Sequence, residues 1–206
     1  MKKRLAIFDL DGTLINSLAE IEYIFNSVLP EHDVEPKKTS FYKKNIGNGI
    51  EDLLQKCLPK NHDLDFNKVL GDIRESYNIN VNKYATVFDG IYNVLDTFVK
   101  NNIKITVITN KPHKFAVGSV KFHFEGYKID VIGAGNQFER KPDPTSSIHI
   151  LKKHNILYDE TIKKSQDYNN PDSRVRQEMY YTRGVATILD IMWGKILRMY
   201  SVVEAM

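Results

Sequence analysis

Two aspartates, Asp9 and Asp11, lie at the end of a short apolar run, residues 4–10. Such a run, ending in a tight turn at Gly12, is typical of a buried parallel strand. Side chains two positions apart on a strand face the same side, so we expect the two carboxylates to converge. A divalent cation would compensate their charge, and oxygen ligands of this kind suit Mg²⁺. The alternative is that both aspartates only cap the following helix or form a turn.

Two more polar residues, Thr109 and Lys141, are placed where predicted strands and helices join. Thr109 ends a β-branched run at 103–108. Lys141 begins a segment that opens a helix, with Asp143 as the expected N-cap and Pro144 at the first helical position. Because ligands in doubly wound sheets bind outside the carboxyl ends of the strands, both residues are candidates for the same site as the aspartates. Taken alone, Thr109 would be an ordinary strand residue and Lys141 a surface lysine.

The elements that must position these residues alternate between strand and helix over most of the chain. Apolar residues at helical spacing predict three helices within 16–83, a span with no clear strand signal. Beyond it, the apolar pattern predicts a helix at 91–99 and strands at 103–108, 129–132 and 185–192. Strands that alternate with helices imply parallel βαβ units. We therefore predict an α/β fold: a doubly wound, Rossmann-like parallel sheet core formed by 1–15 and 84–206, with an all-helical cap inserted at 16–83.

The composition indicates an ordinary globular protein and excludes several other classes. The 206 residues are 42% apolar and 27% charged, with a net charge of +3. The basic residues are scattered among acidic ones, which is typical of solvated helix faces rather than of a nucleic-acid groove. No stretch approaches the ~18 apolar residues of a membrane span, and the N-terminus does not resemble a signal peptide. The single cysteine, Cys57, excludes an internal disulfide and is expected in the core. Together, these features predict a cytoplasmic protein.

Residues 8–14, with Ser17 shortly after them, resemble the first signature of the haloacid dehalogenase-like hydrolases. The Asp-X-Asp-Gly-Thr core of that signature, placed after an apolar strand, is highly specific. Thr109 fits the second signature, a threonine or serine that ends an apolar strand. Lys141 fits the third, a lysine that opens a helix. The resemblance covers nearly the whole chain, including a helical cap inserted directly after the first signature.

The resemblance implies a magnesium-dependent phosphatase that works through a covalent intermediate. Asp9 would attack phosphorus and become an aspartyl-phosphate, and Asp11 would act as general acid and then general base. Mg²⁺ would offset the negative charge of nucleophile and substrate. Thr109 would donate its hydroxyl to a phosphate oxygen, and Lys141 would neutralise charge on the nucleophile and the transferring group. An acid at Asp11 also argues against dehalogenase chemistry, which needs none there.

The resemblance further implies that the substrate is a small phosphorylated metabolite, because residues 47–49 and 109–112 are most similar to those of phosphoglycolate phosphatases. Six residues are the candidates for substrate binding: Gly12, Thr13, Gly47, Gly49, Asn110 and Lys111. Asn110 and Lys111 could instead be simple turn residues, and the glycines of the cap could serve loop geometry alone. The alternative function is a sugar-phosphate mutase, which has the same catalytic pair. We expect no nucleic-acid or membrane partner, and a monomer or homodimer.

The fourth signature of the family, an apolar strand ending in Gly-Asp with a second acid four residues on, is matched only in part. Asp172 is in place, but Pro171 occupies the glycine position and Arg176 that of the second acid. Counting forward from Lys141 points instead to Asp167. We take Asp172 as the third metal ligand beside the two aspartates of the first signature, and Asp167 as the alternative. The departure leaves open a third function, that of a catalytically weakened, binding-only member of the family.

Overall fold

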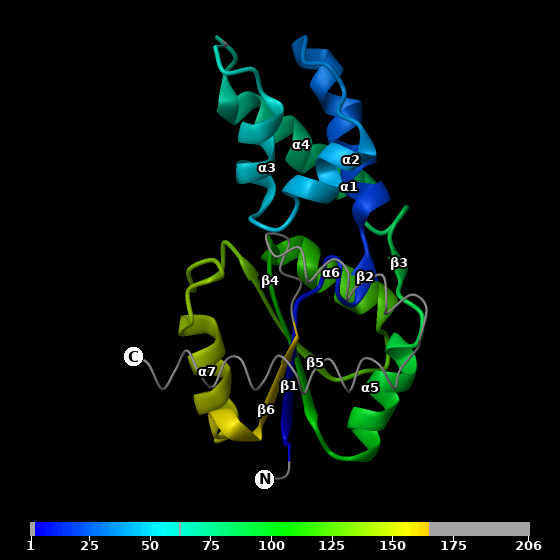
Figure 1. Ribbon diagram of the computed structural model, residues 1–206, viewed down its shortest axis with the longest axis vertical. Helices are drawn as coiled ribbons and strands as arrows, with labels where there is room; N and C mark the ends of the chain where they lie inside the picture. The colour runs from blue at the N-terminus through cyan, green and yellow to red at the C-terminus, as the bar shows by residue number, and fades with distance from the viewer. Residues whose placement is uncertain (1–2, 62, 165–206) are drawn as a thin grey trace.

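A parallel sheet forms the centre of the computed structural model, which describes residues 3–61 and 63–164 (Figure 1). Its four described strands are β1 (Leu5–Phe8), β4 (Lys104–Pro112), β5 (Ile129–Ala134) and β6 (Thr161–Lys164). They are hydrogen-bonded in the order β5-β4-β1-β6, and every neighbouring pair is parallel. Helices cover both faces of this sheet. The predicted α/β fold with a doubly wound parallel core is therefore confirmed.

The apolar sequence of β1 explains why this strand lies in the middle of the sheet. All four of its side chains are buried, and they alternate between two hydrophobic clusters. Ala6 and Phe8 face α5 (Ile91–Lys100) and α6 (His113–His123), while Leu5 and Ile7 face the side covered by α7 (Thr145–His154). A strand buried on both faces needs such a continuous apolar run.

The helical part of the chain packs around an apolar cluster of its own. Its α-helices are α1 (Leu18–Val28), α2 (Thr39–Asn45), α3 (Ile50–Cys57) and α4 (Phe66–Asn80), with a short 3₁₀ helix at Leu29–His32. Their buried side chains form one cluster, which includes Cys57, so the core position predicted for this cysteine is confirmed. The sequence predicted α1, α3 and α4 but not α2, because Tyr42 is the one buried side chain of α2 and a single residue makes no apolar stripe.

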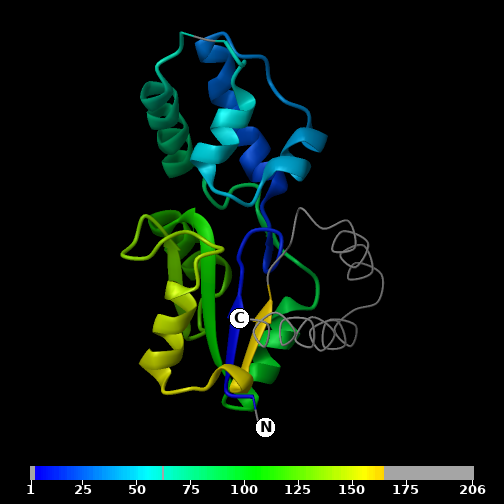
Figure 2. The ribbon, with the colours of Figure 1, turned by 60° about the vertical axis from the view of Figure 1, so that its left-hand side comes forward.

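Two chain segments connect the helices to the sheet, and they run side by side (Figure 2). β2 (Ile15–Asn16) leads into α1, and β3 (Thr86–Val87) leads back from α4. The two strands pair antiparallel, Ile15 opposite Val87 and Asn16 opposite Thr86. Two-residue strands are too short to show an alternating pattern, so they could not be predicted from the sequence. None of the described helices is long and apolar enough to cross a membrane.

The end of β4 and the start of α7 differ from those expected from the sequence. β4 does not stop at Thr109 but continues to Pro112, with an irregular register against β5 after Ile108. Helix α7 begins at Thr145 with Pro144 as its N-cap, so Pro144 is not the first helical residue. Asp143 lies one residue before that cap, yet its Oδ1 accepts a hydrogen bond from Thr145 N at 2.9 Å.

Strand β6 was not predicted, because it has a single aliphatic residue, Ile162. The predicted strand at 185–192 lies outside the described residues.

A glycine in β5 allows the close approach of the chain that follows β4. A Cβ atom on Gly133 would lie 2.6 Å from His113 Cα and 2.7 Å from the carbonyl oxygen of Lys111, both backbone atoms that cannot rotate away. We expect Gly133→Ala to lower the free energy of unfolding by about 3 kcal/mol, at the upper end of overpacking costs. Urea denaturation followed by circular dichroism measures this.

The matched control is Gly118→Ala in α6, where a Cβ atom would meet nothing within 4 Å. There the same change should raise the free energy of unfolding by about 0.5–1 kcal/mol, because alanine is the better helix former. Equal stabilities of the two variants would contradict the close packing of Gly133 against the end of β4.

Candidate active site

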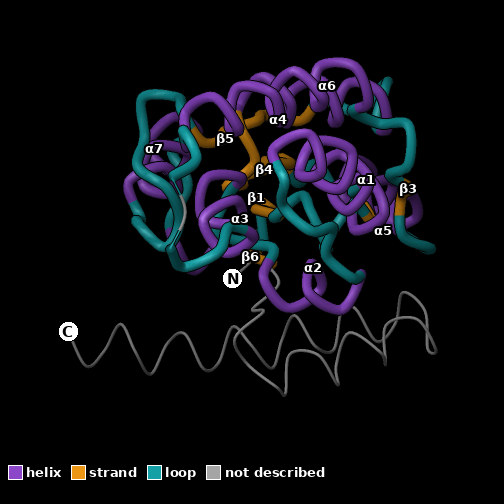
Figure 3. Tube along the Cα trace, turned by 90° about the horizontal axis from the view of Figure 1, so that it is seen from above, coloured by secondary structure: helices purple, strands orange, loops and turns teal. Residues whose placement is uncertain are grey.

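A pocket lies at the carboxyl edge of the sheet, below the helical part of the chain. It encloses about 440 Å³, including open solvent at its mouth. Seen from above, α1, α3 and α4 lie over the ends of β1 and β4 (Figure 3). Twelve residues line the pocket: Asp9, Asp11, Ile21, Ile46, Gly47, Gly49, Ile50, Leu53, Tyr77, Thr109, Asn110 and Lys111. The polar residues come mostly from the sheet and the apolar ones from the helices.

Asp9 and Asp11 reach the same pocket because the chain turns directly after β1. The Oδ1 of Asp9 accepts a hydrogen bond from Leu10 N at 2.8 Å. Leu14 N donates to Leu10 O at 2.9 Å, and Gly12 N donates to Ile15 O at 2.8 Å, so the turn closes on itself. Gly12 has φ +70°, a conformation that a side chain disfavours. The convergence expected of the two carboxylates is therefore present.

Each of the two aspartates is paired with a lysine from a distant part of the chain. Lys141 Nζ lies 2.8 Å from Asp9 Oδ1, and Lys111 Nζ lies 3.2 Å from Asp11 Oδ1. The side chains of Asp9 and Lys141 are 12% and 19% exposed, so this pair is largely shielded from water. Lys141 stands in the loop before α7 rather than at the first turn of that helix. The pairings bring together residues that the sequence marked separately as candidates.

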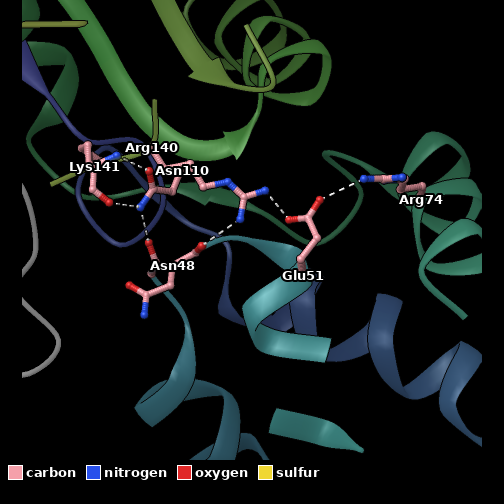
Figure 4. A network of polar contacts seen from close by, with 7 residues as sticks. Asn48, Glu51, Arg74, Asn110, Arg140 and Lys141 are labelled. Carbon is pink, nitrogen blue, oxygen red and sulfur yellow. Dashed lines mark hydrogen bonds and ion pairs between the residues drawn. The ribbon is translucent and has the colours of Figure 1, made fainter. Parts of the chain in front are cut away.

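The side chain of Asn110 joins the loop before α7 to the loop before α3 (Figure 4). Its Nδ2 donates to Gly47 O at 3.0 Å and to Lys141 O at 3.2 Å, while its Oδ1 accepts from Lys141 N at 2.9 Å. Asn110 therefore fixes the backbone of Lys141. It is not a simple turn residue, because it lies within β4.

Gly49 is tightly surrounded at the same loop. Its φ is +98°, and a Cβ atom on it would lie 3.0 Å from a guanidinium nitrogen of Arg140 and 3.3 Å from Asn110 O. Both conditions favour glycine. Gly47 and Gly49 also both line the pocket.

The remaining predicted residues differ in their relation to the pocket. Thr109 is 5% exposed and lines it, with its Oγ1 accepting a hydrogen bond from Lys111 N at 3.2 Å. Gly12 and Thr13 are not among the lining residues. The hydroxyl of Thr13 is buried without a hydrogen-bond partner in the described part of the chain. Their expected contact with substrate stays a prediction.

An ion pair links the loop before α7 to the helices beside the pocket (Figure 4). Arg140, next to Lys141, pairs with Glu51 of α3, and Glu51 lies 2.9 Å from Arg74 of α4. Burial tends to raise the pKa of Glu51, but hydrogen bonds from its own backbone and from Arg140 and Arg74 outweigh it. The pKa of Glu51 is therefore below its usual value of 4.5.

Two residues near the pocket escaped the sequence reasoning. Glu20 is fully buried, and burial raises its pKa although Lys111 opposes the shift. The sequence does contain a sign of it, because Glu20 lies one turn before Ile24, inside the apolar stripe of the predicted helix. Tyr77 of α4 is buried, lines the pocket and stacks on Phe115.

The donor set of the pocket fits a magnesium ion. Mg²⁺ keeps several waters and is commonly held by one or two carboxylates together with substrate phosphate. Asp9 and Asp11 supply two carboxylates to one pocket. Among residues 3–61 and 63–164, no group of three or more histidine, cysteine, aspartate or glutamate side chains is arranged so that it could hold a metal ion. Asp172 and Asp167, the two candidates for the third ligand, lie outside the described residues, as do Pro171 and Arg176.

Comparison with known proteins agrees with the fold described above. The family model described as haloacid dehalogenase-like hydrolase matches residues 6–163. The phosphoglycolate phosphatase of Aquifex aeolicus is 31% identical over 162 residues, an alignment that covers 78% of this chain and 73% of that enzyme. Phosphoglycolate phosphatase 1 of Pseudomonas aeruginosa is 26% identical over 160 residues. That match covers 74% of this chain but only 58% of the relative.

A solved structure has the same fold. The crystal structure of a predicted phosphoglycolate phosphatase from Haemophilus somnus superposes with a TM-score of 0.72 at 21% identity. The superposition covers 79% of this chain and 76% of that one.

The lowered pKa of Glu51 gives a testable dependence of stability on pH. A carboxylate with a depressed pKa in the folded protein adds stability above its unfolded pKa and loses it as the pH falls through the folded one. We expect Glu51→Gln to lower the free energy of unfolding by about 1 kcal/mol at neutral pH. The difference from wild type should shrink as the pH falls below 4.5. Urea titrations at a series of pH values measure it.

The exposed Glu75 of α4 supplies the control, because Glu75→Gln makes the same chemical change away from Arg140. Its effect should be small at every pH. A Glu51→Gln effect that persists unchanged at low pH would show that the charge of Glu51 does not stabilise the contact between sheet and helices.

Proposed function

The chain belongs to the haloacid dehalogenase-like hydrolases, and on that basis we propose that it is a magnesium-dependent phosphatase acting on a small phosphorylated metabolite. The observation that carries the proposal is the 2.8 Å pairing of Lys141 Nζ with Asp9 Oδ1 at the end of β1. Asp11 lines the same pocket. A carboxylate nucleophile, an acid beside it and a cation for the phosphoryl group are the parts that phosphoester hydrolysis needs.

The proposed reaction has two steps, both at phosphorus. An Asp9 oxygen attacks phosphorus and the ester bond breaks, giving an aspartyl-phosphate on Asp9. The leaving alkoxide takes a proton from Asp11 and departs as an alcohol. Asp11 then accepts a proton from water, and the hydroxide attacks phosphorus, releasing inorganic phosphate and restoring Asp9. Lys141 offsets the charge of nucleophile and phosphoryl group, and the Thr109 hydroxyl donates to a phosphate oxygen.

Magnesium would be held by the carboxylate of Asp9 and the backbone carbonyl of Asp11, with Asp172 as the proposed third ligand, so the side chain of Asp11 stays available for proton transfer. When bound, Mg²⁺ supplies positive charge that offsets the repulsion between the nucleophile and the phosphate. Asp167 is the alternative third ligand. Either assignment leaves the roles of the lining residues unchanged.

The pocket and the relatives together favour a substrate of the phosphoglycolate class. The upper wall of the pocket is apolar and comes from the helical part of the chain. We propose that this part, residues 16–83, is a cap. A cap that closes over the site excludes water and admits small substrates. Gly47, Gly49, Asn110 and Lys111 are the proposed substrate contacts within the pocket, with Gly12 and Thr13 beside it. The relatives include phosphoglycolate phosphatases, and we propose the same class of substrate for this chain.

The function is tested by phosphate release from a panel of small phosphoesters that includes phosphoglycolate and sugar phosphates. We expect release that requires Mg²⁺ and stops on chelation. Asp11→Asn should lower the rate about 10²–10⁴-fold, the usual contribution of a general acid, and Asp9→Asn should lower it at least as much. The control is Asp89→Asn, an exposed aspartate that does not line the pocket. No release from any ester by folded protein would favour the weakened, binding-only function.

The third metal ligand is tested by comparing Asp172→Asn with Asp167→Asn. Loss of a group that only supports a metal ligand typically costs about 10–100-fold in metal affinity or activity, and loss of a ligand should cost at least as much. We therefore expect Asp172→Asn to raise the Mg²⁺ concentration for half-maximal rate about 10–100-fold, while Asp167→Asn leaves it unchanged. The opposite pattern would assign the ligand to Asp167. Unchanged Mg²⁺ dependence in both variants would contradict a third aspartate ligand from this segment.

A further inference from the structure

Glu20 is a buried carboxylate for which the proposed reaction has no use. It lies in the first turn of α1 and is fully shielded from solvent. Burying a charge is costly unless a partner of opposite charge and hydrogen-bond donors compensate it. Glu20 is not one of the pocket-lining residues, so its position has to be explained by the groups it contacts.

Those groups connect Glu20 to Asp11, the candidate acid/base residue. The Oε2 of Glu20 accepts a hydrogen bond from Asn82 N, and the Oε1 of Glu20 lies 3.6 Å from Lys111 Nζ. The same ammonium lies 3.2 Å from Asp11 Oδ1 and 5.4 Å from the centre of the Tyr77 ring. The side chain of Lys111 is 1% exposed, so these contacts, rather than water, surround its charge.

A lysine ammonium ends a flexible four-carbon chain, so its position depends on the groups that it contacts. The Lys111 ammonium lies between the carboxylate of Asp11, after β1, and that of Glu20, on α1. If Asp11 were the one carboxylate paired with Lys111, no second contact would fix the position of the Lys111 ammonium. We propose that Glu20 is a positioning residue that holds the Lys111 ammonium at a fixed place beside Asp11. The inference rests on the proposed function in so far as Asp11 moves the proton.

The same contacts tie Lys111 to both connections between sheet and helices. Glu20 lies in the helix that follows β2, and Asn82 lies in the return segment before β3. A displacement of the helices that moves either connection therefore moves Glu20 relative to Lys111. The place of the ammonium beside Asp11 thus depends on how the helical part sits over the sheet.

The kinetic test compares Glu20→Gln with Glu22→Gln. Glu22 lies on the same helix and accepts a hydrogen bond from Thr39 Oγ1, away from the pocket. We expect Glu20→Gln to lower kcat about tenfold with KM changed less than threefold, and Glu22→Gln to change neither. Glu20→Asp, which keeps the charge with a shorter reach, should recover part of the loss. In a Lys111→Met background, Glu20→Gln should have no further effect on kcat.

A purely structural role gives a different result, and either part of it would overturn the proposal. Glu20→Gln would then lower the melting temperature while kcat stayed unchanged. Alternatively, its effect on kcat would add fully to that of Lys111→Met.

A second measurement does not need enzyme turnover. A buried, paired lysine ammonium gives ¹H–¹⁵N correlations in NMR spectra, and Lys111→Met identifies the signal of Lys111. We expect the signal in wild type and Glu22→Gln, and a shifted or lost signal in Glu20→Gln. An unchanged signal in Glu20→Gln overturns the proposal even when the enzyme is active. If Glu20→Gln does not fold, Glu20→Asp decides in the same way. Wild-type protein that releases no phosphate would refute the proposed function, while the spectra would still decide the role of Glu20.

Discussion

The mutual repulsion of two carboxylates at the end of one strand is the constraint on which the rest of the site depends. Asp9 and Asp11 enter the same pocket because the chain turns directly after β1. Two negative charges that line one pocket, with side chains only 12% and 15% exposed, require positive partners. The structure provides one lysine for each, and neither lysine is near the aspartates in the sequence. The fold therefore has to bring three separate segments to one edge of the sheet.

The parallel sheet meets this requirement through its strand order. β1 lies between β4 and β6, so the ends of β1 and β4 are neighbours and bring Lys111 beside Asp11. The loop after β5 brings Lys141 across the end of β4, where the amide of Asn110 holds its backbone. Neighbouring strands thus supply the acid pair and the polar residues around it. The same edge is where doubly wound sheets bind their ligands.

Much of this arrangement could be predicted from the sequence, because it is encoded locally. The apolar run before Asp9 and the β-branched run before Thr109 each identify a strand and its end within a few residues. Helix α7 was misplaced only slightly, since Asp143 caps Thr145 from one position further back. Strand β6 was missed because one isoleucine among polar residues does not look buried. Helix α2 was missed because Tyr42 is its one buried side chain, which makes no apolar stripe.

The partners of individual side chains could not be predicted. That Lys111 pairs with both Asp11 and Glu20 depends on how α1 lies over β4, which no local pattern encodes. The link from Arg140 to Glu51 likewise joins segments that are adjacent only after folding. Glu20 was missed, and its one local sign is a charged residue on an apolar helix face. Tertiary contacts of this kind decide the electrostatics of the pocket, and they are the part that needed a structure.

The pairing of β2 with β3 has a consequence for how the protein could change over evolution. The helical segment leaves and re-enters the core at two points that are hydrogen-bonded to each other. The ends of the segment are therefore closed by the core itself, and the entropic cost of closing a loop grows only slowly with its length. A longer, shorter or unrelated insert could occupy the same two attachment points without altering the strands beneath. New substrate preferences could then arise by exchanging the insert while the phosphate chemistry of the sheet edge is inherited intact.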